Sequence, residues 1–173
     1  ASDALGEWGH AAAGTTSLER CDTGQAAHIR RLVTLTPSLA GMWHAAGVLA
    51  DMVLPRQDAY TLARVYAPKA QGAWGLHGAC AASRTCTFVL FSSVAALLGS
   101  AGQANYAAAN ACLDAVASWR HVHGNPSVSV QWGAWAEVGM ASRGAASERM
   151  AAMEAASGFG RIQLAQGLSA LHM

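Results

Sequence analysis

The chain has 173 residues, of which 53% are apolar and 12% are charged, and its formal net charge is +1. This composition supplies apolar side chains for the core of about one domain and excludes a disordered polypeptide. The only adjacent basic pair is Arg30 and Arg31, which argues against nucleic acid as a partner. No apolar run reaches the roughly 18 residues of a membrane helix, so we expect a soluble protein with no membrane partner.

Cysteine usage indicates a reducing compartment. Cys21, Cys80, Cys86 and Cys112 show neither CxxC spacing nor a paired cluster, and their neighbours are typical of buried positions. We therefore expect free thiols and a location in the cytoplasm or an organelle stroma. The charged fraction lies well below the roughly 25% of typical soluble domains, which indicates that part of this surface contacts another protein segment.

The first part of the chain alternates weak strand candidates with a clear helix. Residues 17–21 are the weakest strand candidate, and residues 41–46 are a stronger one. Between them, Asp22 and Gln25 have the spacing of a capping box, followed by an apolar stripe that ends before Pro37. The pattern predicts one surface helix there, with Asp22 at its N-cap.

The middle of the chain carries the clearest elements. Residues 62–77 hold two apolar stripes at helical spacing around Pro68, which predicts a kinked helix. Residues 87–91 and 128–132 are short, nearly continuous apolar runs, as in parallel strands covered on both faces. Between them, residues 103–119 form an Ala-rich, strongly periodic helix.

The end of the chain completes an alternation of strands and helices. Residues 133–147 lack periodicity and suit a mobile lid or substrate loop, and three leucines then indicate a last short helix: Leu164, Leu168 and Leu171. Alternating strands and helices define the α/β class, with an open parallel sheet and right-handed crossovers. In such sheets ligands bind at the carboxyl ends of the strands, where Ser93 and His44 are expected to lie.

The most specific pattern spans residues 91–110. Ser93 stands thirteen positions before Tyr106, and Asn110 stands four positions after it. This segment resembles the short-chain dehydrogenase/reductase superfamily, and its spacing is similar to that of the ketoreductase domains of polyketide synthases and animal-type fatty acid synthases. Three further segments match signatures of that family in the same order: HAAGV at 44–48, APKAQG at 67–72 and WGAW at 132–135.

The chemistry of ketone reduction gives an independent reason for these residue types. Hydride reduction needs a proton donor at the carbonyl oxygen, and a free tyrosine with a pKa of about 10 is a poor one unless its phenolate is stabilised. Lys69 can supply a nearby cation, Ser93 can hydrogen-bond the carbonyl oxygen, and Tyr106 can deliver the proton. Asn110 lies one helical turn from Tyr106 and can hold a water or a backbone carbonyl in a proton relay.

The resemblance implies that these four residues are catalytic, with Lys69 coming from the preceding helix and Asn110 in the position that a lysine occupies in the wider superfamily. It implies NADPH as the cofactor and no metal. The cofactor contacts would come from one acidic side chain against the adenine ring, one backbone segment and two of the catalytic residues: Asp22, Ala45, Ala46, Gly47, Lys69 and Tyr106. Asp22 can equally serve as an N-cap alone, and His44 is expected to be structural.

One part of the family pattern is absent. No GxGxxG or close variant follows a strand, and Gly6, Gly9 and Gly14 lie too far apart to form the turn that binds a pyrophosphate. The arginine that would select NADPH over NADH is also absent. We therefore expect an incomplete Rossmann-like doubly wound sheet that lacks its first strands. In the order 3-2-1-4-5-6, strands four to six would remain contiguous.

These expectations divide the chain into three regions: a poorly supported N-terminal remnant at 1–21, a catalytic core at 22–132, and a lid loop with a C-terminal helix at 133–173. The resemblance also assigns substrate contact or stereocontrol to four residues: Asp51, Leu98, Gln103 and Met140. The segment Leu49-Ala50-Asp51 keeps two residues of the Leu-Asp-Asp pattern of reductases that form D-hydroxy products, and Leu98 replaces the tryptophan of those that form L-hydroxy products. These features favour a D-3-hydroxyacyl product.

The resemblance thus implies an NADPH-dependent reductase of a β-ketoacyl thioester carried on an acyl carrier protein, alongside other synthase domains in one polypeptide. Two alternatives stay open. The first is a structural fragment of a synthase that cannot bind the cofactor alone, which the missing glycine turn favours and which would make the isolated chain inactive. The second is a related epimerase or dehydratase, which the arrangement of Lys69 and Asn110 disfavours.

Overall fold

The computed structural model describes the following residues: 17–36, 38–80, 86–139, 151, 154–155, 158 and 160–171. Within them, a parallel sheet is formed by β1 (Gly41–His44), β2 (Thr87–Ser93) and β3 (Ser127–Trp132), in the order β1-β2-β3. Phe88 of β2 is in register with Met42 on one side and with Ser127 on the other. The predicted α/β class and the contiguity of these three strands are therefore confirmed.

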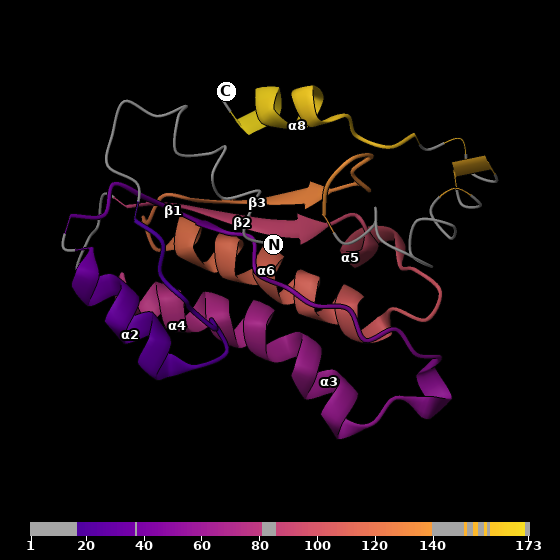
Figure 1. Ribbon diagram of the computed structural model, residues 1–173, viewed down its shortest axis with the longest axis horizontal. Coiled ribbons are helices and arrows are strands. Elements are labelled where there is room, and N and C mark those ends of the chain that lie inside the picture. The colour runs from indigo at the N-terminus through magenta and orange to yellow at the C-terminus, as the bar shows by residue number, and fades with distance from the viewer. Residues whose placement is uncertain are drawn as a thin grey trace.

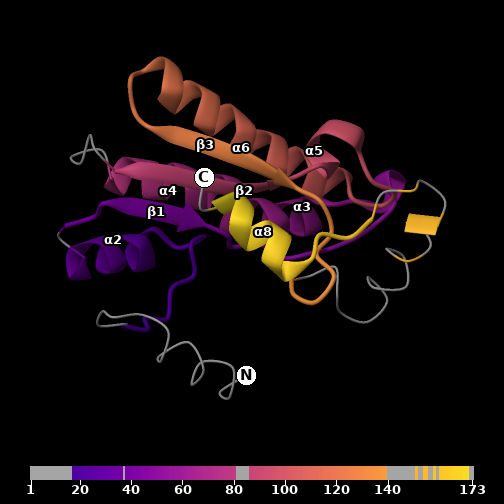
Figure 2. The same cartoon turned by 90° about the horizontal axis from the view of Figure 1, so that it is seen from above.

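Helices cover the sheet on both sides. The elements are α2 (Ala26–Leu35), η1 (Leu54–Arg56), α3 (Ala59–Tyr66), the π-turn η2 (Ala67–Gln71), α4 (Gly72–Ala79), α5 (Ala95–Leu98), α6 (Ala104–Val122) and α8 (Leu164–Leu171). Figure 1 shows α2, α3, α4 and α6 on one face of the sheet and α8 on the other, and the view from above has α8 crossing in front of the strands (Figure 2). No described helix is long and apolar enough to cross a membrane.

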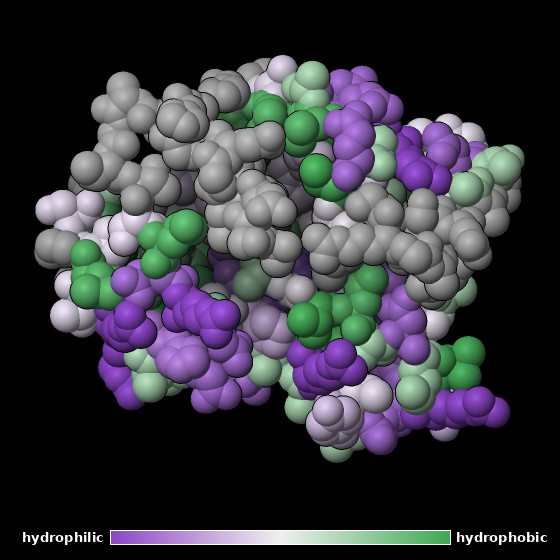
Figure 3. Space-filling view, in the orientation of Figure 1, coloured by the Kyte–Doolittle hydropathy of each residue, from purple (hydrophilic) through white to green (hydrophobic). Residues whose placement is uncertain are grey.

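The core lies between the sheet and the helices of the α6 face. Phe88 and Leu90 project from β2 onto this side because alternate strand residues share a face, and both are completely buried. Their buried partners come from three helices: Ile29, Ala73, Leu76, Leu113, Val116 and Ala117. The side chains of His28, Arg30 and Arg31 on α2 are exposed, and Figure 3 shows a largely hydrophilic surface where α2 lies in Figure 1.

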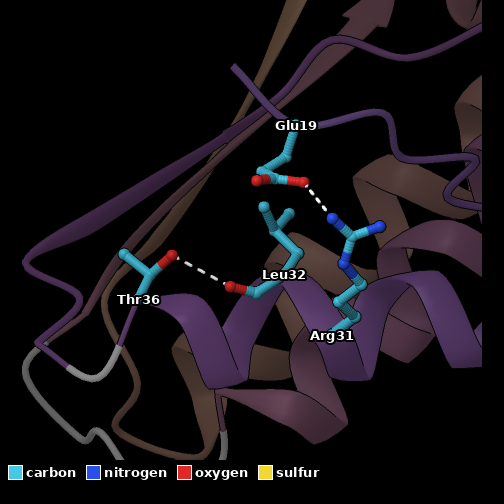
Figure 4. A network of polar contacts seen from close by, with 4 residues as sticks. All are labelled: Glu19, Arg31, Leu32 and Thr36. Atoms are coloured by element: carbon cyan, nitrogen blue, oxygen red, sulfur yellow. Dashed lines mark hydrogen bonds and ion pairs between the residues drawn. The ribbon is translucent and has the colours of Figure 1, made fainter. Parts of the chain in front are cut away.

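The strand expected at residues 17–21 is wrong. This segment belongs to no strand, and β1 is hydrogen-bonded only to β2 within the described sheet. Without a neighbouring strand to satisfy its backbone groups, a short β-prone segment has no reason to adopt strand geometry. Glu19 instead pairs with Arg31 of α2, while Thr36 Oγ1 donates to Leu32 O at the other end of that helix (Figure 4).

The capping box expected at Asp22 is also wrong. The N-cap of α2 is Gln25, without a side-chain cap, because Asp22 Oδ1 accepts the N–H of Gly24 at 2.9 Å and forms a turn ahead of the helix. A capping box does occur at α3, where the Asp58 carboxylate accepts from Thr61 N at 2.8 Å and Thr61 Oγ1 accepts from Asp58 N at 3.0 Å.

The helix predicted around Pro68 is confirmed, and at Pro68 the α-helical pattern is interrupted by the π-turn η2 between α3 and α4. Proline has no N–H and its ring clashes with the carbonyl four residues back, so the helix widens by one residue before α4 begins. The Ala-rich helix is confirmed as α6 and starts directly after the turn at Gly102, whose φ of 74° disfavours other residues. The last short helix is confirmed as α8.

The remaining expectations concern the loop and the cysteines. Only 133–139 of the expected lid loop lie among the described residues, and there Trp135 bridges to Ile162 just before α8. All four cysteines are free thiols. The structure places the thiols of Cys80 and Cys86 next to each other, which their spacing in the sequence did not indicate. Burial and then the neighbouring Cys86 thiol raise the pKa of Cys80 to about 11.

Candidate active site

Three elements bring polar side chains together at the carboxyl ends of the strands. Ser93 is the last residue of β2, Tyr106 and Asn110 lie on the first turns of α6, and Lys69 lies on the π-turn η2. In parallel α/β sheets these strand ends form one edge, which is where ligands bind. The structure thus gathers the four residues that the sequence pattern singled out.

Lys69 is a buried cation. Its side chain is only 3% exposed, its Nζ donates to Phe91 O at 3.0 Å, and Nζ lies 5.4 Å from the centre of the Tyr106 ring. Burial lowers the pKa of Lys69 to about 8, and the negative charge of Asp114 partly opposes that effect. The ammonium form therefore predominates at neutral pH.

The close approach of Gly47 holds the Lys69 side chain in place. A Cβ atom at position 47 would come within 2.8 Å of Lys69 Cε and 3.5 Å of its Nζ. Real Cβ atoms do not approach carbon so closely, so any other residue at 47 would displace the end of the lysine. The glycine of the 44–48 segment is therefore required by the position of the cation.

Two side chains from other segments anchor the π-turn that carries Lys69. The ring of His44 forms a hydrogen bond of 3.1 Å between Nε2 and Lys69 O, and Thr23 Oγ1 donates to Pro68 O at 2.8 Å. Burial lowers the pKa of His44, so the ring is neutral at pH 7 and Nε2–H is the donor. His44 is thus structural, as expected, and its structural role acts on Lys69.

Tyr106 is largely buried and its pKa is raised. Burial is the main cause, whereas hydrogen bonds with the Ser93 and Asn110 side chains lower the pKa and so stabilise the phenolate. Ser93 Oγ also accepts the N–H of Ala95 at 3.2 Å, which fixes the hydroxyl at the start of α5. The cation expected from the sequence would lower this pKa, but burial outweighs the groups that stabilise the phenolate.

Asn110 is completely buried beside Tyr106. Its Nδ2 donates to Tyr106 O at 2.8 Å, and its own backbone carbonyl accepts from Ser92 Oγ at 3.2 Å. Its Oδ1 is buried without a hydrogen-bond partner in the described part of the chain. An unpaired buried acceptor is costly, so this atom suits a donor that the chain itself does not supply, such as a water.

The residues expected at the substrate rim are partly brought together. Gln103 Nε2 donates to Asp51 Oδ1 at 3.1 Å, next to the start of α6. Leu98 is 64% exposed at the end of α5. Met140 lies outside the described residues.

The residues expected to contact a cofactor flank the buried cation. Ala45, Ala46 and Gly47 directly follow β1, and Gly47 lies against Lys69. Asp22 is exposed in a turn whose next residue, Thr23, is hydrogen-bonded to the π-turn. The backbone segment after β1 and the turn with the exposed Asp22 carboxylate therefore both lie next to the segment that carries Lys69.

The parallel sheet and the Ser93, Tyr106, Asn110 and Lys69 cluster define a Rossmann-like protein of the short-chain dehydrogenase/reductase type. The KR domain family matches residues 7–137, and the chain belongs to this family. The chain is 46% identical over 152 residues, 86% of its length, to the polyketide synthase GfsB of Streptomyces halstedii, and 42% identical over 134 residues, 75% of its length, to a phthioceranic/hydroxyphthioceranic acid synthase of Mycobacterium bovis. It covers 3% and 6% of these two relatives.

Solved ketoreductase structures are also similar. The chain matches the first ketoreductase of the tylosin polyketide synthase with a TM-score of 0.77 and 36% identity, over 87% of this chain and 32% of that one. It matches a structure of A-type ketoreductases from a modular polyketide synthase with a TM-score of 0.82 and 34% identity, over 90% of this chain and 33% of that one. The chain thus spans about a third of these structures.

Proposed function

We propose that this chain carries the proton-delivering part of an NADPH-dependent ketoreductase in a polyketide or fatty acid synthase. The reaction reduces a β-ketoacyl thioester to a β-hydroxyacyl thioester. The observation that supports this most is the convergence of Ser93, Tyr106 and Asn110, with the ammonium group of Lys69 5.4 Å from the Tyr106 ring. Family membership and similarity to polyketide synthases support the same reaction.

Tyr106 is the proton donor in this proposal. Its raised pKa keeps the phenol protonated at neutral pH, so the proton is available when the substrate binds. As negative charge develops on the substrate carbonyl oxygen, Ser93 donates a hydrogen bond to that oxygen and Tyr106 transfers its proton to it. The phenolate that remains is stabilised by the same side chains that lower its pKa. The Lys69 ammonium group, 5.4 Å from the centre of the ring, would favour it electrostatically.

The residues present fit a nicotinamide cofactor. Lys69 and Tyr106 would hold its nicotinamide half, the backbone of Ala45, Ala46 and Gly47 would line it, and Asp22 would face the adenine. The unpaired Oδ1 of Asn110 supports a relay in which a water or a ligand hydroxyl donates to this atom and returns a proton towards Tyr106. When bound, NADPH supplies the hydride.

The substrate in this proposal is tethered to an acyl carrier protein, which acts with the other domains of the synthase in a reducing compartment such as the cytoplasm. Asp51, Gln103, Leu98 and Met140 would line the substrate entry. Leu98 is small and exposed where a bulky indole would block one route for the carrier arm. Asp51, held by Gln103, orders the opposite rim, which supports a D-3-hydroxyacyl product.

The test is steady-state oxidation of NADPH by the purified synthase polypeptide that contains this chain, with a β-ketoacyl thioester as substrate. We expect turnover with NADPH and a predominantly D product by chiral chromatography. Absence of turnover with any β-ketoacyl thioester would overturn the proposed reaction. A predominantly L product would overturn only the stereochemical assignment.

The absence of a GxGxxG turn from the sequence favours a second candidate, a structural segment that cannot bind the cofactor alone. We expect residues 1–173 by themselves to bind NADPH weakly and to show negligible activity. Calorimetric titration of the isolated chain checks this expectation. A low micromolar dissociation constant would show that the adenine and nicotinamide contacts suffice without that turn.

A further inference from the structure

Asn105 is a buried amide directly before Tyr106 that the reaction scheme leaves without a role. Its side chain is 1% exposed. Its Oδ1 accepts the N–H of Tyr106 at 2.8 Å, and its Nδ2 donates to Ala50 O at 2.9 Å and to Thr61 O at 3.5 Å. One side chain thus connects the start of α6 with α3 and with the segment after β1.

The contact with Tyr106 replaces an ordinary helix cap. The first N–H groups of a helix have no acceptor within the helix, and a side chain at the N-cap usually supplies one. The N-cap of α6 is Gln103, whose side chain forms no cap and instead donates to Asp51. Asn105 therefore satisfies the backbone N–H of Tyr106 from inside the first turn and fixes the residue that carries the phenol.

The contact with Ala50 belongs to a continuous pairing of two segments. Met52 N donates to Gly102 O at 2.7 Å, Gln103 Nε2 donates to Asp51 Oδ1 at 3.1 Å, and Asn105 Nδ2 donates to Ala50 O. Residues 50–52 thus run alongside residues 102–105 in the opposite direction. These hydrogen bonds fix the segment that carries Asp51 against the first helical turn of α6, which carries Tyr106. Among them, the bond from the buried Asn105 side chain lies nearest to Tyr106 in the sequence.

We propose that Asn105 is a positioning residue that fixes Tyr106 relative to the Asp51 rim, and so couples proton delivery to the orientation of the substrate. This inference rests on the proposed ketoreduction. The Oδ1 acceptor of Asn105 positions Tyr106, and its Nδ2 donor positions the rim. Removal of the whole amide releases both segments, whereas loss of the donor function alone releases the rim and leaves the N–H of Tyr106 satisfied.

The two functions separate in two variants of the polypeptide that contains this chain. Asn105→Ala loses both functions, so we expect kcat to fall by about tenfold or more, since small misplacements of reacting groups are costly. We also expect more of the minor hydroxyacyl enantiomer and little change in the KM for NADPH. Asn105→Asp keeps the acceptor and loses the donor when its carboxyl is ionised. Because burial raises the pKa of a carboxyl, this variant is compared with the unchanged protein at pH 9. We expect it to retain most of kcat while the minor enantiomer still increases.

The matched control is Asn125→Ala, which removes an amide just after the other end of α6, where Nδ2 donates to His123 O. It should match the unchanged protein in kcat and in product ratio. A readout independent of catalysis is hydrogen exchange of the Tyr106 amide, which should be faster in Asn105→Ala and near normal in Asn105→Asp.

The proposal is overturned if Asn105→Ala retains normal kcat and product ratio, or if the Tyr106 amide exchanges as slowly as before. If Asn105→Ala does not fold, Asn105→Asp decides, and an unchanged product ratio in that variant overturns the proposal. If the unchanged protein reduces no β-ketoacyl thioester, ketoreduction itself fails, and hydrogen exchange still tests the placement of Tyr106 by Asn105.

Discussion

The burial of Lys69 predicts a conflict between activity and stability. Its pKa falls from the ordinary 10.5 to about 8, so keeping the side chain charged in the folded state costs about 3 kcal/mol, at about 1.4 kcal/mol for each tenfold change in proton affinity. Lys69→Met keeps the length of the side chain and removes the charge. It also removes the hydrogen bond to Phe91 O, which offsets about 1.5 kcal/mol. We therefore expect the variant to be about 1.5 kcal/mol more stable at pH 7 and inactive.

The stability difference between the two proteins should change with pH in a defined direction. The folded protein releases the Lys69 proton near pH 8 and the unfolded chain near 10.5, so the unfolded chain binds more protons in between. The stability of the unchanged protein therefore rises by about 2.5 kcal/mol between pH 7 and pH 10, so the advantage of Lys69→Met is lost across that window and the unchanged protein is the more stable of the two at pH 10. Urea unfolding of both proteins at pH 7 and pH 10 measures the difference. A variant that is less stable at both values, with a constant difference, would refute the reasoning.

Three further substitutions test the surroundings of Lys69. Gly47→Ala should lower kcat by about tenfold or more with little change in melting temperature, because the new Cβ moves only the lysine tip. The control Gly78→Ala meets open space on α4, so it should leave kcat unchanged and raise the melting temperature slightly, since Ala is the better helix former. Asp114→Asn removes the charge that raises the pKa of Lys69, so the alkaline limb of the profile of kcat/KM against pH should move to lower pH; an unmoved limb would contradict this. His44→Phe breaks the bond to Lys69 O and should cost about 1 kcal/mol in urea unfolding, and equal stability would argue against that anchor.

The fold could be predicted where burial itself sets the sequence pattern. β2 lies between two strands and against helices, so its apolar run is visible in the sequence. The expectation that β3 is covered on both faces is wrong, because β3 pairs with β2 alone within the described sheet and Val128 is 47% exposed. Residues 17–21 show the limit of such reasoning, because a strand requires a neighbouring strand that local composition cannot supply. The prediction of a capping box at Asp22 fails for a related reason. An aspartate carboxylate can accept a hydrogen bond from a helix N-terminus or from the N–H two residues on, and only the surrounding packing decides which of the two forms.

The candidate site divides in the same way. Tyr106 and Asn110 share one helix face, so their spacing predicts their proximity. The position of Lys69 depends on the π-turn at Pro68 and on the carbonyl of Phe91, which lie apart in the sequence. The role of Asn105 follows from contacts with residues 44 and 55 positions away, and no local pattern indicates it.

Replacement of Tyr106 by phenylalanine tests the central claim most directly, because the ring stays in place and only the proton donor is lost. The measurement is NADPH oxidation by the polypeptide that contains this chain, with a β-ketoacyl thioester, in the Tyr106→Phe variant and the unchanged protein. We predict that turnover falls by about 10²-fold to 10⁴-fold while the melting temperature and NADPH affinity stay close to normal. Near-normal turnover by the variant would contradict the assignment of Tyr106 as the proton donor.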